Sequence, residues 1–395
     1  MKKIVLIAIP AIAMLASCAK NEVYTPESDP QQITFTTLVN KTKASQKDEI
    51  ISGTAYPTDE TFGTFAFFNS STTTFPTSAE VYIPESEVKN TSKATSGTVW
   101  TTETAYYWPK QGSLTFFSYS PYDELNAVTS CDATDGIKID SWNVKDKQTV
   151  DVMVADYKTA QKQNGAYGGY TGVPTIFRHK LAQIVKFTFK TDKAYAKGTL
   201  TSPQIGDKFF FINSVVLNNL QVSGTYTSGN NVDGAATPKV LGAWDNLSGA
   251  EKFTWYDKGT NDGTAFDENG AEVAANGLDG RSYLLVMPQA FPQVDDNYTD
   301  AKTLKISYTI RTYTGTGAND YTEELVTEDK NGSKPLTLIP LCYLHGGSTD
   351  KDGASWEMNT KYSYTIKIGL DQIYWAPGVV EYEEKAWDEY SLIAQ

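Results

Sequence analysis

The residue with the clearest chemical role in the sequence is Cys18. It ends the run Leu15-Ala16-Ser17-Cys18, where small residues precede a cysteine near the start of the chain. This run looks like a bacterial lipobox, in which a peptidase cuts between Ser17 and Cys18 and the thiol takes a diacylglycerol. An amide-linked acyl chain such as palmitate, together with two ester-linked chains, anchors a protein durably, whereas one chain binds marginally. The alternative is an ordinary signal peptide with an incidental cysteine.

The residues before Cys18 have the order of a signal peptide. Met1-Lys2-Lys3 is a short positive segment, and Ile4 to Leu15 is an apolar one. About a dozen apolar residues are too few to span a bilayer as a stable helix. We therefore expect residues 1–17 to be a removed signal peptide and residues 18–31 to be a polar tether. The mature chain is expected at the outer membrane, held there by its lipid anchor.

Other residues that often carry chemistry are few. His179 lies on the apolar face of a predicted strand, and His345 precedes two glycines in a predicted loop, with no cysteine or histidine nearby to share a metal. We expect His179 to be a buried, hydrogen-bonded structural residue. After lipidation only Cys131 and Cys342 remain, far apart in the sequence. They either form a disulfide in an oxidising compartment or are two buried small apolar residues.

The sequence contains no HExxH, GxSxG, Walker or dinucleotide-binding glycine motif. Carboxylates occur near glycines at Asp257 to Gly270 and at Asp350 to Gly353, but without EF-hand spacing, so solvated turns explain them better than a weak calcium site. Glu383 and Glu384 are adjacent and face opposite sides of a strand, so they are no acid–base pair. We expect no enzyme activity, no cofactor and no metal.

Two aromatic groups offer a platform for a sugar ring. They are Tyr106-Tyr107-Trp108 and Tyr374-Trp375. Rings at alternate strand positions are more often core or inter-sheet packing, and that alternative stays open at both places. A non-polymerising surface lipoprotein that binds glycan is therefore the second functional hypothesis, with Trp108 and Trp375 as the residues to mutate.

The elements that position these residues are β-strands almost everywhere. Tyr, Phe, Trp and Thr are abundant, and such side chains suit a pleated, half-buried surface. Apolar residues alternate with period two, and no window after the signal segment has a sustained helical pattern. Strands are predicted at residues 32–38, 63–68, 113–119, 150–155, 177–189, 208–220, 283–288, 304–310, 336–341 and 362–370. A parity shift between Leu181 and Ile184 indicates a bulge, and residues 158–171 and 256–280 are expected to be long polar loops.

The length of 395 residues favours two domains, each large enough to bury a core. Many short strands separated by turns predict an all-β protein of sandwiches or barrels. A Gly-rich stretch before Phe177 places the boundary between an N-terminal domain over 32–173 and a C-terminal domain over 174–395. The net charge of -13 repels phosphate backbones, so we expect no nucleic-acid partner.

Several motifs follow one another along the chain after the lipobox. They are Ile33-Thr34-Phe35, Tyr107-Trp108-Pro109, Leu114 to Pro121, Asp151 to Ala155, Phe177-Arg178-His179-Lys180-Leu181-Ala182, Trp356 to Gly369, and Trp387. In this order they resemble the fimbrillin family, the subunits of type V pili of anaerobic gut and oral bacteria. Residues 177–182 are similar to the family's Phe-x-His-x-Leu strand, and residues 356–369 to its late Tyr-x-Tyr-x-Ile strand. The resemblance covers nearly the whole chain.

The resemblance implies two tandem transthyretin-like β-sandwiches and a structural or accessory subunit of a cell-surface fimbria used in adhesion. It also implies a route to the outer membrane as a lipoprotein, where an arginine-specific protease removes the first strand. A strand from a neighbouring subunit, usually its C-terminal tail, then enters the open groove and pairs its free N–H and C=O groups. The implied partners are other pilus subunits and a host or glycan receptor.

In this sequence the leaving strand would be Ile33 to Leu38, and the donor would come from Ile373 to Gln395. The apolar donor candidates are Val379, Val380, Tyr382, Trp387 and Leu392. An alternative for this short acidic tail is that it completes its own sheet.

The expected cleavage arginine is missing, because the first arginine in the chain is Arg178. Only Lys41, Lys43 and Lys47 occupy the region after the first strand. Either a protease that accepts lysine cuts there, or the chain stays uncut and lipidated as an anchor or accessory subunit.

Overall fold

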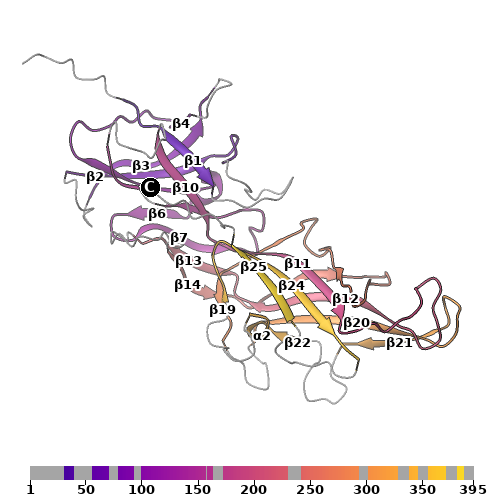
Figure 1. The fold of residues 1–395 in the computed structure, drawn as a ribbon. Coiled ribbons are helices and arrows are strands. Elements are labelled where there is room, and N and C mark those ends of the chain that lie inside the picture. Colours follow the sequence, from indigo (N-terminus) through magenta and orange to yellow (C-terminus); the bar gives the residue numbers. More distant parts are fainter. Residues whose placement is uncertain are drawn as a thin grey trace, which may run out of the picture.

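The computed structural model describes residues 31–39, 56–70, 79–92, 99–156, 158–162, 172–229, 242–292, 301–327, 338–345, 355–370 and 380–386. Nearly all regular structure in these residues is β-strand, as predicted; the helices are the short α1 (Tyr122–Leu125) and α2 (Leu341–His345). Neither is long and apolar enough to cross a membrane. The molecule is elongated, with the N-terminal strands at one end and β20 (Thr303–Tyr313) and β21 (Tyr321–Val326) toward the other (Figure 1).

The N-terminal half is built on one eight-stranded sheet. Its order is β2 (Phe62–Asn69), β3 (Glu80–Asn90), β4 (Trp100–Thr102), β1 (Phe35–Val39), β10 (Val173–His179), β8 (Met153–Ala155), β5 (Ser113–Ser120) and β9 (Lys158–Gln161). Because β2 also pairs with β5, the sheet closes on itself. Every residue of β5 is buried. Leu114 and Phe116 belong to the core inside this sheet, whereas Phe117 and Tyr119 belong to a second, larger core.

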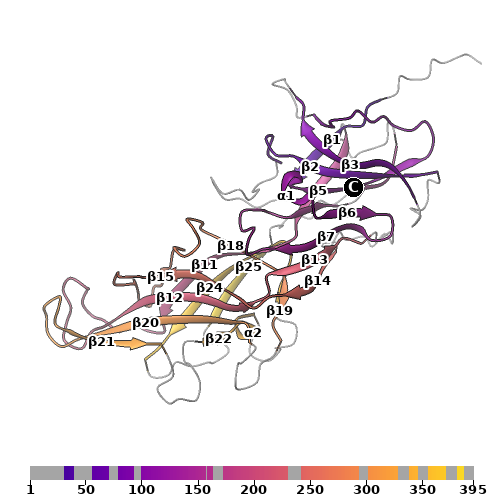
Figure 2. The ribbon, with the colours of Figure 1, turned by 180° about the vertical axis from the view of Figure 1, so that it is seen from behind.

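A four-stranded sheet joins the two halves. Its order is β14 (Ala243–Ser248), β13 (Ser223–Thr227), β7 (Gly136–Asn143) and β6 (Thr129–Asp132). β6 and β7 come from the N-terminal half and β13 and β14 from the C-terminal half, and the four lie side by side in the middle of the molecule (Figure 2). The joining pair is antiparallel and places Tyr226 opposite Ile139.

The C-terminal half contains two more sheets that share a core. The first has the order β17 (Ala271–Glu272), β11 (Ala182–Thr191), β24 (Thr360–Ile368) and β25 (Val380–Ala386), with β18 (Leu284–Val286) also paired to β11. The second has the order β15 (Glu251–Asp257), β12 (Lys208–Leu220), β20 and β21, with β16 (Thr264–Phe266) on β12 and β22 (Leu338–Pro340) on β20. A short pair joins β19 (Gln289–Ala290) to β23 (Ser355–Trp356). The two large sheets meet through Phe187 and Trp255, whose ring centroids lie 5.1 Å apart.

The apolar cores do not coincide with the two predicted domains. The smaller core contains only residues between Ile33 and Phe177. The larger core runs from Phe65 in the N-terminal half to Ile368 in the C-terminal half. The two halves therefore share one continuous apolar core in addition to the sheet that joins them.

The long strand predicted over residues 177–189 is in fact two strands. The chain leaves the N-terminal sheet after His179 and enters a different sheet at Ala182, so the parity shift marks a crossing between sheets. A separate register irregularity lies between Ile184 and Lys186. The division predicted at residues 173 and 174 falls where β10 begins, and the change of sheet follows only after that strand.

Other local predictions also need correction. The strand expected over residues 336–341 ends early: β22 covers Leu338–Pro340 and α2 begins at Leu341, while residues 336 and 337 lie outside the described part. His345 consequently ends a helical turn and does not lie in a loop. β9, β16 and β17 lie within the two segments expected to be loops. Short strands of this kind have too few residues to show a period in the sequence.

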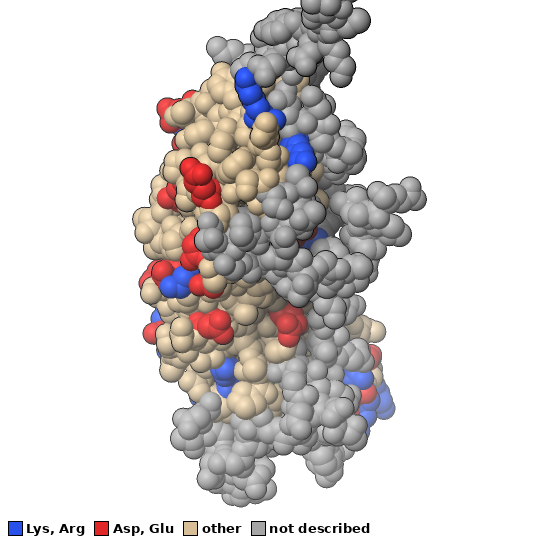
Figure 3. All heavy atoms as spheres, turned by 90° about the vertical axis from the view of Figure 1, so that its left-hand side faces the viewer, with Lys and Arg blue, Asp and Glu red and all other residues tan. Residues whose placement is uncertain are grey.

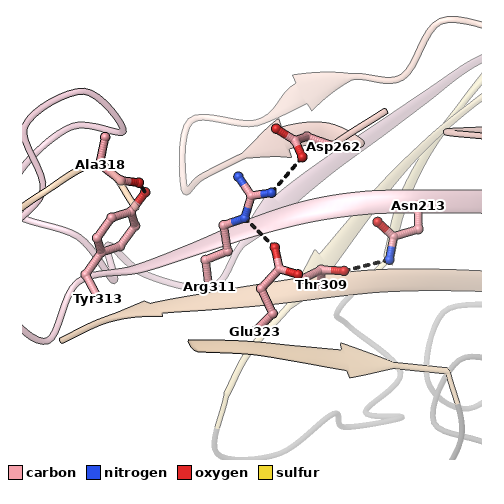
Figure 4. A network of polar contacts seen from close by, with 7 residues as sticks. All are labelled: Asn213, Asp262, Thr309, Arg311, Tyr313, Ala318 and Glu323. Carbon is pink, nitrogen blue, oxygen red and sulfur yellow. Dashed lines mark hydrogen bonds and ion pairs between the residues drawn. The ribbon is translucent and has the colours of Figure 1, made fainter. Parts of the chain in front are cut away.

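A polar network fixes the far end of the C-terminal half (Figure 4). The guanidinium group of Arg311 donates to Glu323 at 2.7 Å and to Asp262 at 2.8 Å. The same group lies 4.4 Å from the ring centre of Phe211 and 4.7 Å from that of Tyr321. Two carboxylates and two rings compensate its charge, so we assign this arginine a structural role in joining β20, β21 and the turn after β15.

Candidate functional site

The first strand lies between two neighbours in the N-terminal sheet. β1 pairs in parallel with β10 over five residues, starting with Phe35 opposite Val173. On the other side Phe35 pairs with Trp100 of β4, and just upstream the N–H of Ile33 donates to the carbonyl of Tyr106 at 2.8 Å. Removing this segment would leave N–H and C=O groups unpaired on both sides of a groove.

Side chains of the same segment fill the core inside the N-terminal sheet. Ile33 and Phe35 are fully buried, and the ring of Phe35 meets that of Phe116 edge-on at a centroid distance of 5.7 Å. Burial of each stabilises the fold by about 1.5–3 kcal/mol. The backbone approaches closely at Gly172, where a Cβ would come within 2.7 Å of the Thr34 carbonyl oxygen. Gly172 therefore allows the start of β10 to lie against this segment.

The last described strand is an edge strand of the C-terminal half. β25 pairs antiparallel with β24, from Val380 opposite Ile366 to Ala386 opposite Thr360. β24 bonds to β11 on its other side, so β25 is the outermost strand of its sheet among the residues that the structure describes. The tail thus completes its own sheet here, which is the alternative that the sequence left open.

Most predicted site residues lie outside the described part of the chain. Of the donor candidates, Val380 and Tyr382 lie in β25, with Tyr382 opposite Tyr364. The undescribed ones are Ser17 and Cys18 of the expected lipidation site, Lys41, Lys43 and Lys47 of the expected cleavage region, and Val379, Trp387 and Leu392 of the tail. Their roles stay predictions.

Buried charged residues surround the crossing between β10 and β11. Nε and Nη2 of Arg178 donate to the two carboxylate oxygens of Asp156 at 2.7 and 2.9 Å. These side chains are only 10% and 13% exposed. Nδ1 of His179 lies 2.7 Å from the Asp151 carboxylate, and both side chains are fully buried. The prediction that His179 is buried is confirmed. Burial lowers the pKa of His179, although Asp151 opposes the shift.

Lys180 continues this buried group. Its ammonium group lies 5.5 Å from the ring centre of Tyr226, and burial lowers the pKa of Lys180 to about 7 against the opposing charge of Asp156. The N–H of Lys180 donates to the carbonyl of Val152 at 2.7 Å. Its carbonyl accepts a hydrogen bond from the indole N–H of Trp244 at 2.5 Å. Groups from both halves therefore hold the chain where it crosses.

Gln148 also ties the halves together, and sequence reasoning missed it. Its side-chain amide donates to the carbonyl of Leu285 at 2.7 Å and accepts from the N–H of Leu285 at 3.0 Å. It also donates to the carbonyl of Val144 at 2.8 Å. The amide bonds to the backbone of β18 in the same way as a neighbouring strand would. The sequence gives no signal of this contact, because a polar residue between two strands normally indicates a solvated turn. The sequence did contain a signal for Asp151 and Asp156, because these two charged residues stand immediately before and after the apolar run that includes β8.

The site geometry consists of a buried terminal strand, an edge strand at the other end of the chain, and a fixed crossing between them. A family model described as fimbrillin-like matches residues 42–376, which is most of the chain. This chain belongs to the fimbrillin-like family. The family predicted from the sequence is thus confirmed.

Solved structures resemble this fimbrillin-like protein over nearly its whole length. A fimbrial protein from Bacteroides vulgatus has a TM-score of 0.51 and 17% identity, with 90% of this chain and 99% of that one covered. The tip fimbrial protein Mfa3 from Porphyromonas gingivalis, in a C-terminally truncated form, has a TM-score of 0.36 and 12% identity over 90% and 100% of the two chains. The first likeness shows a shared fold. A search of the curated proteins finds no match.

The aromatic group at residues 106–108 of this fimbrillin-like protein is largely core. Trp108 is 7% exposed and meets Phe116 edge-on at 5.9 Å, so the packing alternative holds for its ring. Tyr107 is 46% exposed. Tyr374 and Trp375 lie outside the described residues. Trp108 is therefore a core residue and not a stacking platform, and the second platform at Tyr374 and Trp375 stays a prediction.

Cysteine and carboxylate side chains take structural positions. Cys131 and Cys342 are not joined in a disulfide; Cys342 is buried and Cys131 half-buried. Burial raises the pKa of the Cys131 thiol. The Asp257 carboxylate accepts the N–H of Gly259 at 2.8 Å, as in a solvated turn. The described residues include no group of His, Cys, Asp and Glu able to hold a metal. Figure 3 shows a face where the acidic and basic side chains drawn in colour are scattered and do not gather by sign.

Proposed function

We propose that this chain is a subunit of a cell-surface fimbria and assembles by β-strand exchange. Membership of the fimbrillin-like family supports the subunit role. The observation that carries strand exchange is β1, a terminal strand whose segment contributes two fully buried side chains. Lys41, Lys43 and Lys47 follow it in the sequence, where a protease could release it. The open groove would then accept the strand of another subunit.

The tail contains a segment that matches the leaving strand in character. Ile33-Thr34-Phe35 places a β-branched and an aromatic side chain on one face, and Val380-Glu381-Tyr382 repeats that pattern. A tail in the groove would put Val380 and Tyr382 where Ile33 and Phe35 were. Since β25 already pairs with β24, exchange replaces one set of ladder bonds by another. The driving force then comes from filling the open core of the groove.

The proposal includes the route to the cell surface. The chain is exported, lipidated at Cys18 and attached to the outer membrane, and it works without a cofactor or enzymatic chemistry. Cutting after one of the three lysines makes it a polymerising subunit. Without that cut it serves as a lipid-anchored accessory subunit. Mass spectrometry of the mature N-terminus from native cells separates these forms, since a new terminus between Asn40 and Thr61 marks the first and a triacylated Cys18 the second.

Strand exchange is tested with a chain that lacks residues 1–47. We expect this chain to form ladders in denaturing gels run without boiling, and the full-length chain to stay monomeric. Tyr382→Ala in the truncated chain should reduce the ladder strongly, because it empties the pocket left by Phe35. Glu381→Ala, next to Tyr382 but on the opposite face of the same strand, is the matched control. A truncated chain that remains monomeric at high concentration would disprove assembly by this route.

A further inference from the structure

Parallel pairing is confined to two places among the described strands. β1 pairs in parallel with β10 over five residue pairs, and β11 pairs in parallel with β24 over nine, whereas the other strand pairs are antiparallel. β10 and β11 are consecutive strands separated only by Lys180 and Leu181. They run in the same direction along the elongated molecule (Figure 1). The two parallel pairs thus form one continuous line through both halves.

The ends of each pair determine how it responds to a pull along this line. The N-terminal end of β1 lies beside the N-terminal end of β10, Phe35 opposite Val173. The C-terminal end of β24 lies beside that of β11, Ile368 opposite Thr191. A pull that draws β1 outward at its N-terminus and β24 outward at its C-terminus loads the partner strands at their opposite ends, through the crossing. All ladder bonds of a pair then share the force at once, whereas strands pulled at the same end open one bond at a time.

We propose that tension along the fimbria passes through each subunit by this line, from the strand in the position of β1 to β10, β11 and β24. The inference rests on the proposed function, because a donor strand drawn from its N-terminal side and a tail leaving after Leu370 supply the two ends. The donor would lie parallel to β10, as β1 does.

Hydrogen bonds on both sides hold the crossing between β10 and β11 in place under load. Arg178 is held by two hydrogen bonds to Asp156, and both backbone groups of Lys180 are bonded. The carbonyl of Leu181 accepts the N–H of Asn359 at 3.1 Å, at the start of β24. Force that enters β11 is therefore transmitted to β24 already at the first residues of both strands.

The interior of the β11–β24 pair reinforces its ladder. Phe187 and Tyr364 are directly opposite in register. Their rings stack with centroids 5.2 Å apart and an interplanar angle of 17°. Sliding one strand along the other would separate these rings while it breaks the ladder bonds, so shear is opposed by both.

Single-molecule force spectroscopy on the full mature chain tests the proposal, with the attachment point as the only change. One handle is inserted immediately before Gly172 in both versions. The second handle follows Leu370 in the first version, so that β11 and β24 are pulled at opposite ends. In the second version it is attached at the exposed Glu357, so that β24 is drawn from the end beside Ala182. We expect the first rupture force to be several-fold higher in the first version, since forced unfolding reports the unfolding rate under load.

Equal rupture forces, or a lower force with the handle after Leu370, would overturn the proposed tension line. Matching midpoints of thermal unfolding for the two handle-bearing chains establish that both are folded. Because a monomer is pulled, the result does not depend on assembly. A missing ladder in the strand-exchange assay would count against the proposed function and leave the ranking of rupture forces intact. Equal rupture forces would count against the tension line and leave the ladder result intact.

Discussion

Buried charged side chains lie close together where the chain crosses between the halves. Asp156 accepts two hydrogen bonds from the Arg178 guanidinium, and both side chains are largely shielded from water. Removing one partner of such a pair leaves the other charge uncompensated, whereas removing one partner of an exposed pair leaves it solvated. The two kinds of ion pair in this protein should therefore respond differently to the same substitution.

Asp156→Ala is expected to lower the free energy of unfolding by about 3–5 kcal/mol. The matched control is Glu251→Ala, because Glu251 pairs with Lys145 on the surface, and its expected cost is about 0–1 kcal/mol. Denaturant titration of the two variants and the wild type measures both values. A cost at Asp156 as small as that at Glu251 would show that the crossing does not depend on this pair.

Lys180 should make stability depend on pH above neutrality. Its pKa is lowered from the ordinary 10.5 to about 7, so between these values the unfolded chain binds more protons than the folded one. Stability from this group therefore rises with pH across that window. Lys180→Met removes this titration. The amount by which its free energy of unfolding exceeds that of the wild type should be largest near pH 7 and should shrink toward pH 10.5. Denaturant titrations across the window measure the difference, and a constant difference would contradict the assignment.

The two halves are connected by paired strands and by a side-chain amide that bonds to a strand edge, in addition to the covalent chain. β7 and β13 form one antiparallel pair across the junction, and Gln148 adds its amide to the edge of β18. Such contacts resist bending because each one has a fixed direction and length. The crossing at Lys180 and Leu181 is therefore a joint between paired strands on both sides.

Gln148→Ala tests the side-chain part of this joint. It leaves the N–H of Leu285 buried without its acceptor, which should cost about 1–3 kcal/mol and speed hydrogen exchange of that amide. Gln148→Glu should cost more, because a carboxylate would face the carbonyl oxygens of Leu285 and Val144. Gln204→Ala, at an exposed position, is the control. An unchanged exchange rate at Leu285 in the alanine variant would contradict the role of Gln148.

The whole molecule should unfold as one cooperative unit, because the larger core includes residues of both halves. Hydrogen exchange followed by mass spectrometry at increasing denaturant measures this. Peptides that cover β5 and β12 should lose protection at the same denaturant concentration. The peptide that covers β1 is an internal comparison, since a terminal strand opens at lower concentration. Earlier loss of protection over the entire N-terminal half would show that the halves unfold separately.

The sequence by itself determined the all-β class, the family, and strands whose alternation is long and clean. The strand predicted at residues 208–220 is β12, Lys208–Leu220, and burial of His179 followed from its parity. These features are local, since a period of two says which side chains face a core. The tertiary structure alone decided which strands pair, that residues 177–189 divide between two sheets, and that the tail segment with Val380 and Tyr382 lies on β24. Pairing depends on residues far apart in the chain, and the same alternation fits many partner strands equally well.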